Sequence, residues 1–260
     1  LAVPAQIAGC KEIVLCSPPN KEGKIHPAIL YAADLCGVTK IIKVGGIQAI
    51  AGYTFGTESI PKVYKIFGPG NQYVTVAKQL ATKYGVAIDM PDGPSELLVM
   101  ADTSANAAYV ASDLLSQAEH GADSQVILVT TSKDFAQVVN TEVYKQLNDL
   151  PRKGMATDAI NNSKSIVVDN FETALELIDA YGPEHFIVST TNDDFFVDNI
   201  GNAGSVFIGD YTPESAGDYA SGTNHTLPTN GFSKAYSGVN LDSFLKSMTF
   251  QKISKKGIMV

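Results

Sequence analysis

Two small groups of polar side chains in this sequence could carry out chemistry. Gln117 and His120 are three residues apart near the end of a predicted helix, so both side chains lie on one face and could hold one metal ion. Histidine with oxygen donors suits zinc, and Asp218, in a long polar loop, could add another oxygen. The pair could instead be a polar helix end, where the helix dipole favours a histidine. Spacing alone leaves both interpretations open.

The second group is Glu184 and His185, which open a predicted strand after Tyr181-Gly182-Pro183. A carboxylate beside an imidazole suits general acid/base work, because histidine titrates near neutral pH. Neighbours on a strand point to opposite faces, so both can serve one site only at the irregular start of the strand. The pair predicts an acid/base site, with an ordinary strand start as the alternative.

Weaker signals come from two other segments. Gly68-Pro69-Gly70-Asn71 lies between a predicted strand and a predicted helix, where backbone amides could hold a phosphate. It lacks the three spaced glycines of the dinucleotide-binding fingerprint, so a turn is the simpler interpretation. Cys16 could be a thiolate nucleophile, but no histidine or basic group lies nearby in sequence to lower its pKa, and a buried inert thiol is favoured. His26, before Pro27, is predicted to be a surface residue at a helix start.

These residues are carried by alternating short apolar strands and amphipathic helices, which indicates an α/β fold with mostly parallel sheets covered by helices. The stretch 92–95 interrupts the alternation. We therefore expect two Rossmann-like lobes, residues 1–94 and 95–239, with 240–260 as the start of a C-terminal region. The predicted strands are 12–16, 40–44, 63–67, 97–100, 125–130, 165–168, 185–188 and 205–208. The predicted helices are 26–36, 47–52, 73–83, 106–119, 133–149, 171–181, 193–200 and 243–248. Residues 209–238 are predicted to form a functional loop.

Composition narrows the class of protein. Apolar residues make up 45% of the 260 residues and charged residues 18%, which predicts an ordered chain with a sizeable core. A formal net charge of -8 argues against a nucleic-acid partner. No apolar run approaches the roughly 20 residues that span a bilayer, so no membrane partner is expected. Three cysteines cannot all pair, and a cytoplasmic location is predicted.

Seven long, ungapped runs resemble the histidinol dehydrogenase family. They are IAGCKEIVLCSPP (7–19), VGGIQAIA (44–51), KIFGPGN (65–71), AIDMPDGPSE (87–96), DLLSQAEHGADSQVIL (113–128), YGPEH (181–185) and GSVFIGDYTPESAGDYASGTNHTLPT (204–229). The resemblance runs through essentially the whole chain. It implies a zinc-dependent homodimer that oxidises L-histidinol through L-histidinal to L-histidine with two NAD⁺ and one water, in the last steps of histidine biosynthesis. It also implies two Rossmann-like domains with the site between them.

The resemblance implies a role for each candidate residue. Gln117, His120 and Asp218 would bind zinc, and Glu184 and His185 would be the acid/base pair. The substrate would meet Ser95, Gln117, His120, His185, Asp218 and His225. NAD would meet Gln48 and Asn71.

The resemblance further implies functional residues outside this sequence. A tyrosine that contacts NAD would precede Leu1. A zinc-binding histidine and a substrate-binding glutamate would follow Val260, donated to a site shared with the partner subunit. Both ends of the sequence lack caps, so we expect a piece of a longer protein, at most weakly active alone.

Two other classes of function fit the same residues. A zinc hydrolase could use the same metal and base, and NADH formation would exclude hydrolysis as the main activity. A two-lobed module that only binds small polar ligands would not need the Glu184-His185 pair.

Overall fold

The computed structural model describes residues 1–259 and contains a five-stranded parallel sheet in its second lobe. The strand order is β7-β6-β5-β8-β9. The strands are β5 (Glu96–Ala101), β6 (Gln125–Thr130), β7 (Lys164–Val167), β8 (His185–Ser189) and β9 (Ser205–Ile208). Every residue of β5 is buried, because both faces of this central strand are covered, and this explains its continuous apolar run.

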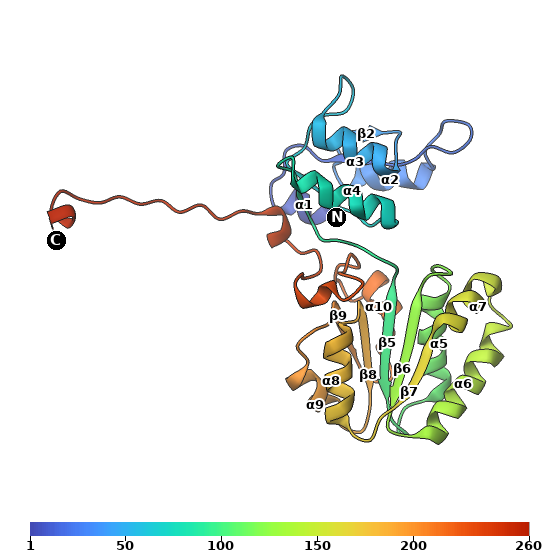
Figure 1. Cartoon of the computed structure of the whole chain (residues 1–260). Helices are drawn as coiled ribbons and strands as arrows, with labels where there is room; N and C mark the ends of the chain where they lie inside the picture. Colours follow the sequence, from blue (N-terminus) through green and yellow to red (C-terminus); the bar gives the residue numbers. More distant parts are fainter. Residues whose placement is uncertain (260) are drawn as a thin grey trace.

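Helices cover the two faces of this sheet as separate layers. Leu97 and Val99 of β5 pack against α5, α6 and α7, whereas Leu98 and Met100 pack against α8 and α9. Figure 1 shows the two layers on either side of the sheet. The helices are α5 (Ala107–Ala118), α6 (Lys133–Leu147), α7 (Lys153–Asn162), α8 (Phe171–Tyr181) and α9 (Asp193–Asn199). The second lobe is therefore the three-layer α/β arrangement that the alternation predicts.

The first lobe contains short strands that form two separate parallel pairs, β1 with β2 and β3 with β4, rather than one sheet. Its small core gathers Ile50, Tyr53, Ile66, Ala81 and Val86. The elements are α1 (Ala2–Ile7), β1 (Val14–Cys16), α2 (Pro27–Leu35), β2 (Lys40–Ile42), α3 (Gly46–Phe55), β3 (Lys65–Ile66), α4 (Gln72–Thr82) and β4 (Ala87–Ile88). Among residues 1–259 no helix is long and apolar enough to cross a membrane.

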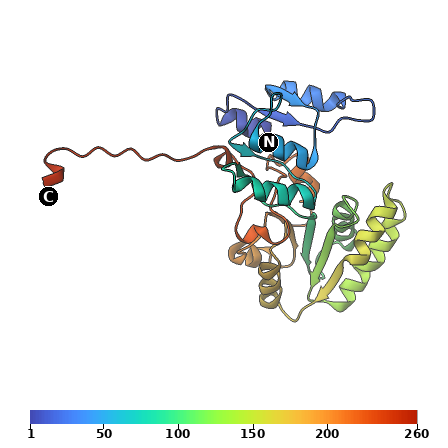
Figure 2. The same ribbon diagram turned by 45° about the horizontal axis from the view of Figure 1, so that its top comes forward.

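The chain returns to the first lobe after the second is complete. Lys65 Nζ donates a hydrogen bond to the Ser243 carbonyl at 2.6 Å, and the rings of Phe67 and Phe244 stack with centroids 4.1 Å apart. From Leu245 to Ser254 the chain runs as an extended segment away from both lobes, the red trace of Figures 1 and 2, and a 3₁₀ turn, Gly257–Met259, follows it.

Two sequence predictions are wrong, and helix α7 was missed. The predicted helix 243–248 is only a 3₁₀ turn, Asp242–Phe244, because an extended segment offers no packing surface to stabilise a short helix. The predicted loop 209–238 contains α10 (Glu214–Tyr219) and a 3₁₀ turn, Phe232–Lys234. Helix α7 was not predicted, because it buries only the small residues Ala156 and Ala159 and has no clear apolar stripe.

Candidate functional site

The predicted site residues of the second lobe gather at the edge of the sheet where its strands begin. Ser95 directly precedes β5, Glu184 and His185 stand at the start of β8, and Gln117 lies in the last turn of α5. This edge is the one nearest the first lobe in Figure 1. Asp218, on α10, and the rings of His120 and His225 lie close enough to His185 to influence its pKa.

The backbone of Glu96 fixes the acid/base pair. Its N–H donates to Glu184 Oε2 at 3.0 Å, and its carbonyl lies 3.1 Å from His185 Nδ1. Because a carbonyl only accepts, Nδ1 carries the proton and Nε2 of the neutral ring keeps its lone pair. The side chains of Glu184 and His185 are only 8% and 7% exposed. The structure thus brings both residues into one place and leaves His185 arranged as a base.

Burial shifts the pKa values of this pair in opposite directions. It lowers the pKa of His185 to about 4, so the imidazole is neutral at pH 7 and can accept a proton. It raises the pKa of Glu184 to about 8, with smaller contributions from the carboxylates of Glu214, Glu96 and Asp92. At pH 7 these surroundings therefore keep His185 neutral, so that it can accept a proton, and favour the protonated form of Glu184.

Gln117 and His120 meet as their spacing predicts, with Gln117 Nε2 and His120 Nδ1 3.1 Å apart. Gln117 is completely buried, and its Oε1 has no hydrogen-bond donor. A buried oxygen without a donor is uncommon, and a cation beside His120 would satisfy it. The residues present therefore fit a metal ion. Within the described chain no three His, Cys, Asp or Glu side chains form a metal-binding group. The predicted set has only two residues of these types, and the zinc site stays a prediction.

An excess of buried carboxyl groups surrounds the pair. Glu214, on α10, lies with Oε1 3.8 Å from His185 Nδ1 and accepts a hydrogen bond from Ser116 Oγ at 3.4 Å. Burial, followed by the charges of Asp218 and Asp113, raises the pKa of Glu214 to about 8. Burial raises the pKa of Glu96 and of Asp113 to about 7 each. Such a site favours cations, as a metal ion or a substrate ammonium.

Sequence reasoning missed Glu96, Asp113 and Glu214. Glu96 and Glu214 stand inside runs that already carried the family resemblance, and a lone acidic residue opening a buried apolar strand could have marked Glu96. The hydrogen bond from the Glu96 N–H to Glu184 joins residues 88 apart in sequence, and the one from Ser116 to Glu214 joins residues 98 apart. Local sequence patterns do not encode such contacts.

The two residues predicted to contact NAD lie on elements of the first lobe, apart from the pair. Gln48 is exposed on α3. Asn71 caps α4, with its Oδ1 accepting from the N–H groups of Tyr73 and Val74. Both belong to the first lobe, so they would meet the second-lobe residues only through a ligand that spans the lobes. Ser95 is half-buried and His225 is exposed.

Cys16 agrees with the interpretation of an inert thiol. Burial raises its pKa, while a hydrogen bond with Tyr53 acts in the opposite direction. Among residues 1–259 all three cysteines are free. His26 is exposed and caps α2, accepting from the Ala28 N–H at 3.2 Å.

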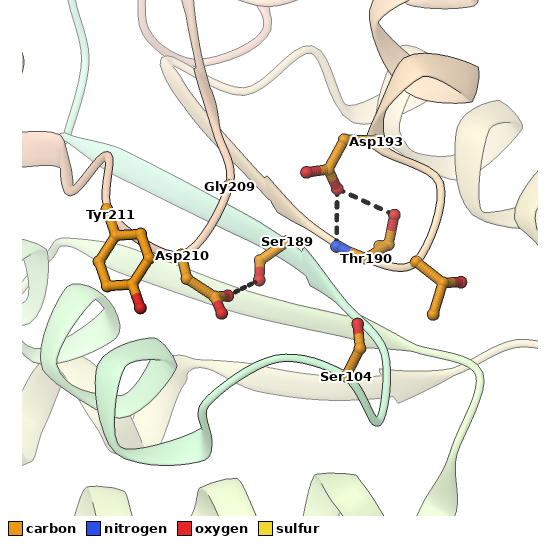
Figure 3. A pocket seen from close by; sticks show the side chains of 8 residues that line it. Ser104, Ser189, Thr190, Asp193, Gly209, Asp210 and Tyr211 are labelled. Atoms are coloured by element: carbon orange, nitrogen blue, oxygen red, sulfur yellow. Dashed lines mark hydrogen bonds between the residues drawn. The ribbon is translucent and has the colours of Figure 1, made fainter.

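A cavity of about 380 Å³ lies at the opposite edge of the sheet, where β5, β8 and β9 end. Figure 3 shows hydrogen bonds among the residues that line it. The Ser189 hydroxyl donates to Asp210, and the backbone N–H and hydroxyl of Thr190 donate to Asp193 Oδ1 at 2.7 and 3.0 Å. Doubly wound sheets commonly bind ligands at this edge. None of the predicted site residues lines this cavity, so the candidate site is the edge near the first lobe.

Comparison with known proteins decides the family. The model of the histidinol dehydrogenase family matches residues 1–259. This chain belongs to the histidinol dehydrogenase family. The histidinol dehydrogenase of Bacteroides thetaiotaomicron is 64% identical over 260 residues, which cover all of this chain and 61% of that protein. That of Escherichia coli K12 is 56% identical over 259 residues, 59% of its length. The chain therefore spans about 60% of these relatives.

Solved structures agree with this assignment. The crystal structure of histidinol dehydrogenase from Elizabethkingia anophelis superposes with a TM-score of 0.96 at 60% identity, covering all of this chain and 60% of that one. An acetylating aldehyde dehydrogenase from Geobacillus thermoglucosidasius reaches a TM-score of 0.58 at 12% identity, covering 94% of this chain and 70% of its own. The second likeness concerns the fold alone.

Proposed function

We propose that the protein carrying this chain oxidises L-histidinol through L-histidinal to L-histidine, with NAD⁺ as hydride acceptor and Zn²⁺ bound by Gln117, His120 and Asp218. The observation that carries the proposal is the neutral, buried His185, held by the Glu96 carbonyl beside Glu184. Family membership supports an oxidoreductase of histidine biosynthesis. When bound, Zn²⁺ would orient and polarise the amino alcohol, and NAD⁺ would accept hydride.

In the first oxidation His185 acts as the base. The hydroxyl proton passes to Nε2 as hydride leaves the carbinol carbon, while Nδ1–H stays bonded to the Glu96 carbonyl. The imidazolium that forms has two carboxyl groups nearby, Glu184 and Glu214, each 3.8 Å from Nδ1. Ionisation of either carboxyl group would stabilise the protonated ring, and the imidazolium would in turn lower the raised pKa of that group.

In the second oxidation Glu184 acts on water. Its carboxylate takes a proton from a water molecule as the oxygen adds to the aldehyde carbon, and the hydrate then loses its hydride. A nearby cation, such as the bound metal ion or the substrate ammonium, would favour the ionised form of Glu184. Because burial raises its pKa to about 8, this carboxylate is a stronger base than an exposed glutamate, and its bond to the Glu96 N–H fixes its direction. Ser95 and His225 would contact the substrate, and Gln48 and Asn71 would contact NAD⁺.

The setting of the reaction is also a proposal. We expect a homodimer, located in the cytoplasm, whose site is shared between subunits, as in the enzymes that the chain resembles. The excess of acidic groups around His185 suits the cationic amine of histidinol and gives no reason to expect a nucleic-acid partner.

Binding measurements on the complete protein that carries this chain test the proposal. Titration calorimetry should detect Zn²⁺ binding that is lost in His120→Ala, and histidinol binding that depends on Zn²⁺. NADH formation from histidinol is measured alongside, with the Bacteroides thetaiotaomicron enzyme as positive control. If the unaltered complete protein binds neither Zn²⁺ nor histidinol while the control is active, the proposed function is refuted.

A further inference from the structure

Lys78, in the middle of α4, is a completely buried cation. Its Nζ donates to Asp92 Oδ2 at 2.5 Å and to the Gly68 carbonyl at 2.8 Å, and it forms an ion pair with Asp89 Oδ1 at 2.6 Å. Burying an ammonium is costly unless it is paired and hydrogen-bonded, and these three partners meet that requirement. The cluster of Lys78, Asp89 and Asp92 therefore fixes three separate segments at one point.

One of these segments is the loop Gly68-Pro69-Gly70-Asn71, and the cluster holds both backbone groups of Gly68. The Gly68 N–H donates to Asp89 Oδ2 at 2.7 Å, and its carbonyl accepts from Lys78. Gly68 has a φ of +124°, a conformation that favours glycine. At the other end of the loop, Asn71 caps α4. The loop is thus held in place at both ends.

A second segment is the linker that begins at Asp92 and leads into β5. The N–H of the next residue, Gly93, donates to Thr229 Oγ1, and a Cβ at Gly93 would lie 2.9 Å from the Cβ of Asn230. The Asn230 N–H in turn donates to Glu96 Oε1 at 3.1 Å. Glu96 is the residue whose backbone holds Glu184 and His185. A continuous series of close contacts therefore joins the loop to the acid/base pair.

We propose that Lys78 is a positioning residue for the dinucleotide: its buried ammonium fixes the Gly68–Asn71 loop relative to the linker, and so relative to Glu184 and His185. The inference rests on the proposed function, in which Asn71 contacts NAD⁺. Hydride transfer needs the nicotinamide placed accurately against the carbon that His185 deprotonates, and displacements of about 1 Å can cost a factor of about 100 in rate.

The test variant is the double substitution Lys78→Met with Asp92→Asn. It removes one positive and one negative charge, so the net charge beside the loop is unchanged and a loss of affinity cannot be attributed to repulsion of phosphate. Asp89 keeps its bonds to the N–H groups of Gly68 and Met90, so no buried carboxylate loses all its partners. The control is Lys83→Met, an exposed position at the end of the same helix.

NAD⁺ and Zn²⁺ affinities are measured by calorimetry, and protection of the Gly68 amide by hydrogen exchange. The double variant should bind NAD⁺ about tenfold more weakly. Protection of the Gly68 amide should fall but not vanish, because its bond to Asp89 remains. Zn²⁺ affinity should stay within about twofold, because the predicted ligands lie in the other lobe. Lys83→Met should change none of the three.

Unchanged NAD⁺ affinity in the double variant would overturn the inference alone, and so would an equal fall in both affinities, which indicates general destabilisation. Absence of NAD⁺ binding to the unaltered complete protein that carries this chain would refute the nucleotide part of the proposed function, and the inference with it. If the double variant does not fold, Asp92→Asn alone is used. It should retain Gly68 protection through Asp89 and still weaken NAD⁺ binding, and an affinity equal to that of the unaltered chain would overturn the inference.

Discussion

Glu184→Gln should stabilise the metal-free chain at alkaline pH. Burial raises the pKa of Glu184 from 4.5 to about 8, so between these pH values the unfolded chain is ionised at this residue while the folded protein keeps the proton. The folded state then binds more protons than the unfolded state, and the free energy of unfolding falls as pH rises through this window. Glutamine cannot ionise and can still accept the hydrogen bond from the Glu96 N–H.

The size of the effect follows from the two pKa values. From about pH 5.5 to about pH 8.5 the ionisation of Glu184 alone lowers the free energy of unfolding by roughly 3 kcal/mol. Glu96, Asp113 and Glu214 also have raised pKa values and add to the same trend in the unaltered chain. The difference between Glu184→Gln and the unaltered chain isolates the contribution of Glu184.

Urea denaturation followed by circular dichroism, in a chelator and at several pH values, measures this difference. The variant should gain stability over the unaltered chain as pH rises, whereas Glu176→Gln, an exposed change on α8, should follow the unaltered chain. Parallel curves for Glu184→Gln and the unaltered chain would show that Glu184 ionises normally, and the reasoning would fail.

Three other changes test the site. In the proposed reaction Glu184→Gln should slow histidinal oxidation by about 10²- to 10⁴-fold and histidinol oxidation less, and equal losses with the two substrates would contradict the division of roles. Gly204→Ala places a Cβ 2.5 Å from the Glu184 carbonyl oxygen, so it should lower the free energy of unfolding by about 2 kcal/mol or more. Gly154→Ala, with open space around the new Cβ, should not. Equal melting temperatures for the two variants would contradict this expectation. Gln117→Leu should weaken Zn²⁺ binding at least about tenfold. It should not lower the stability of the metal-free chain, because it removes a buried oxygen that has no hydrogen-bond donor. The control is Gln137→Ala, at an exposed position on α6.

Much of the second lobe could be predicted from sequence, because its elements are long and their ends carry local signals. Asn106, Ser132 and Asn170 each cap a helix by accepting a backbone hydrogen bond. The spacing of Gln117 and His120 likewise predicts their contact, because helical geometry fixes which neighbours meet.

The rest depends on tertiary contacts. Helix α10 forms in a Gly- and Ser-rich loop because Gly217 lies against Phe207 of β9, where a Cβ would be 2.9 Å from the ring. The role of Glu96 lies in its backbone, which no side-chain pattern reveals. The strands of the first lobe have only two or three residues each, too few for a periodicity to show whether they join one sheet.

The position of β8 in the sheet has a consequence for folding during synthesis. Strand β8 pairs with β5 although it follows it by nearly 90 residues, and the bond from the Glu96 N–H to Glu184 spans 88. Gln117 and His120, three residues apart, can meet as soon as α5 forms. At translation rates of about 5–20 residues per second, several seconds separate the two events. These first two residues of the predicted zinc site can therefore meet before Glu184 and His185 are synthesised, whereas Asp218, the third predicted ligand, follows both and would complete the site last.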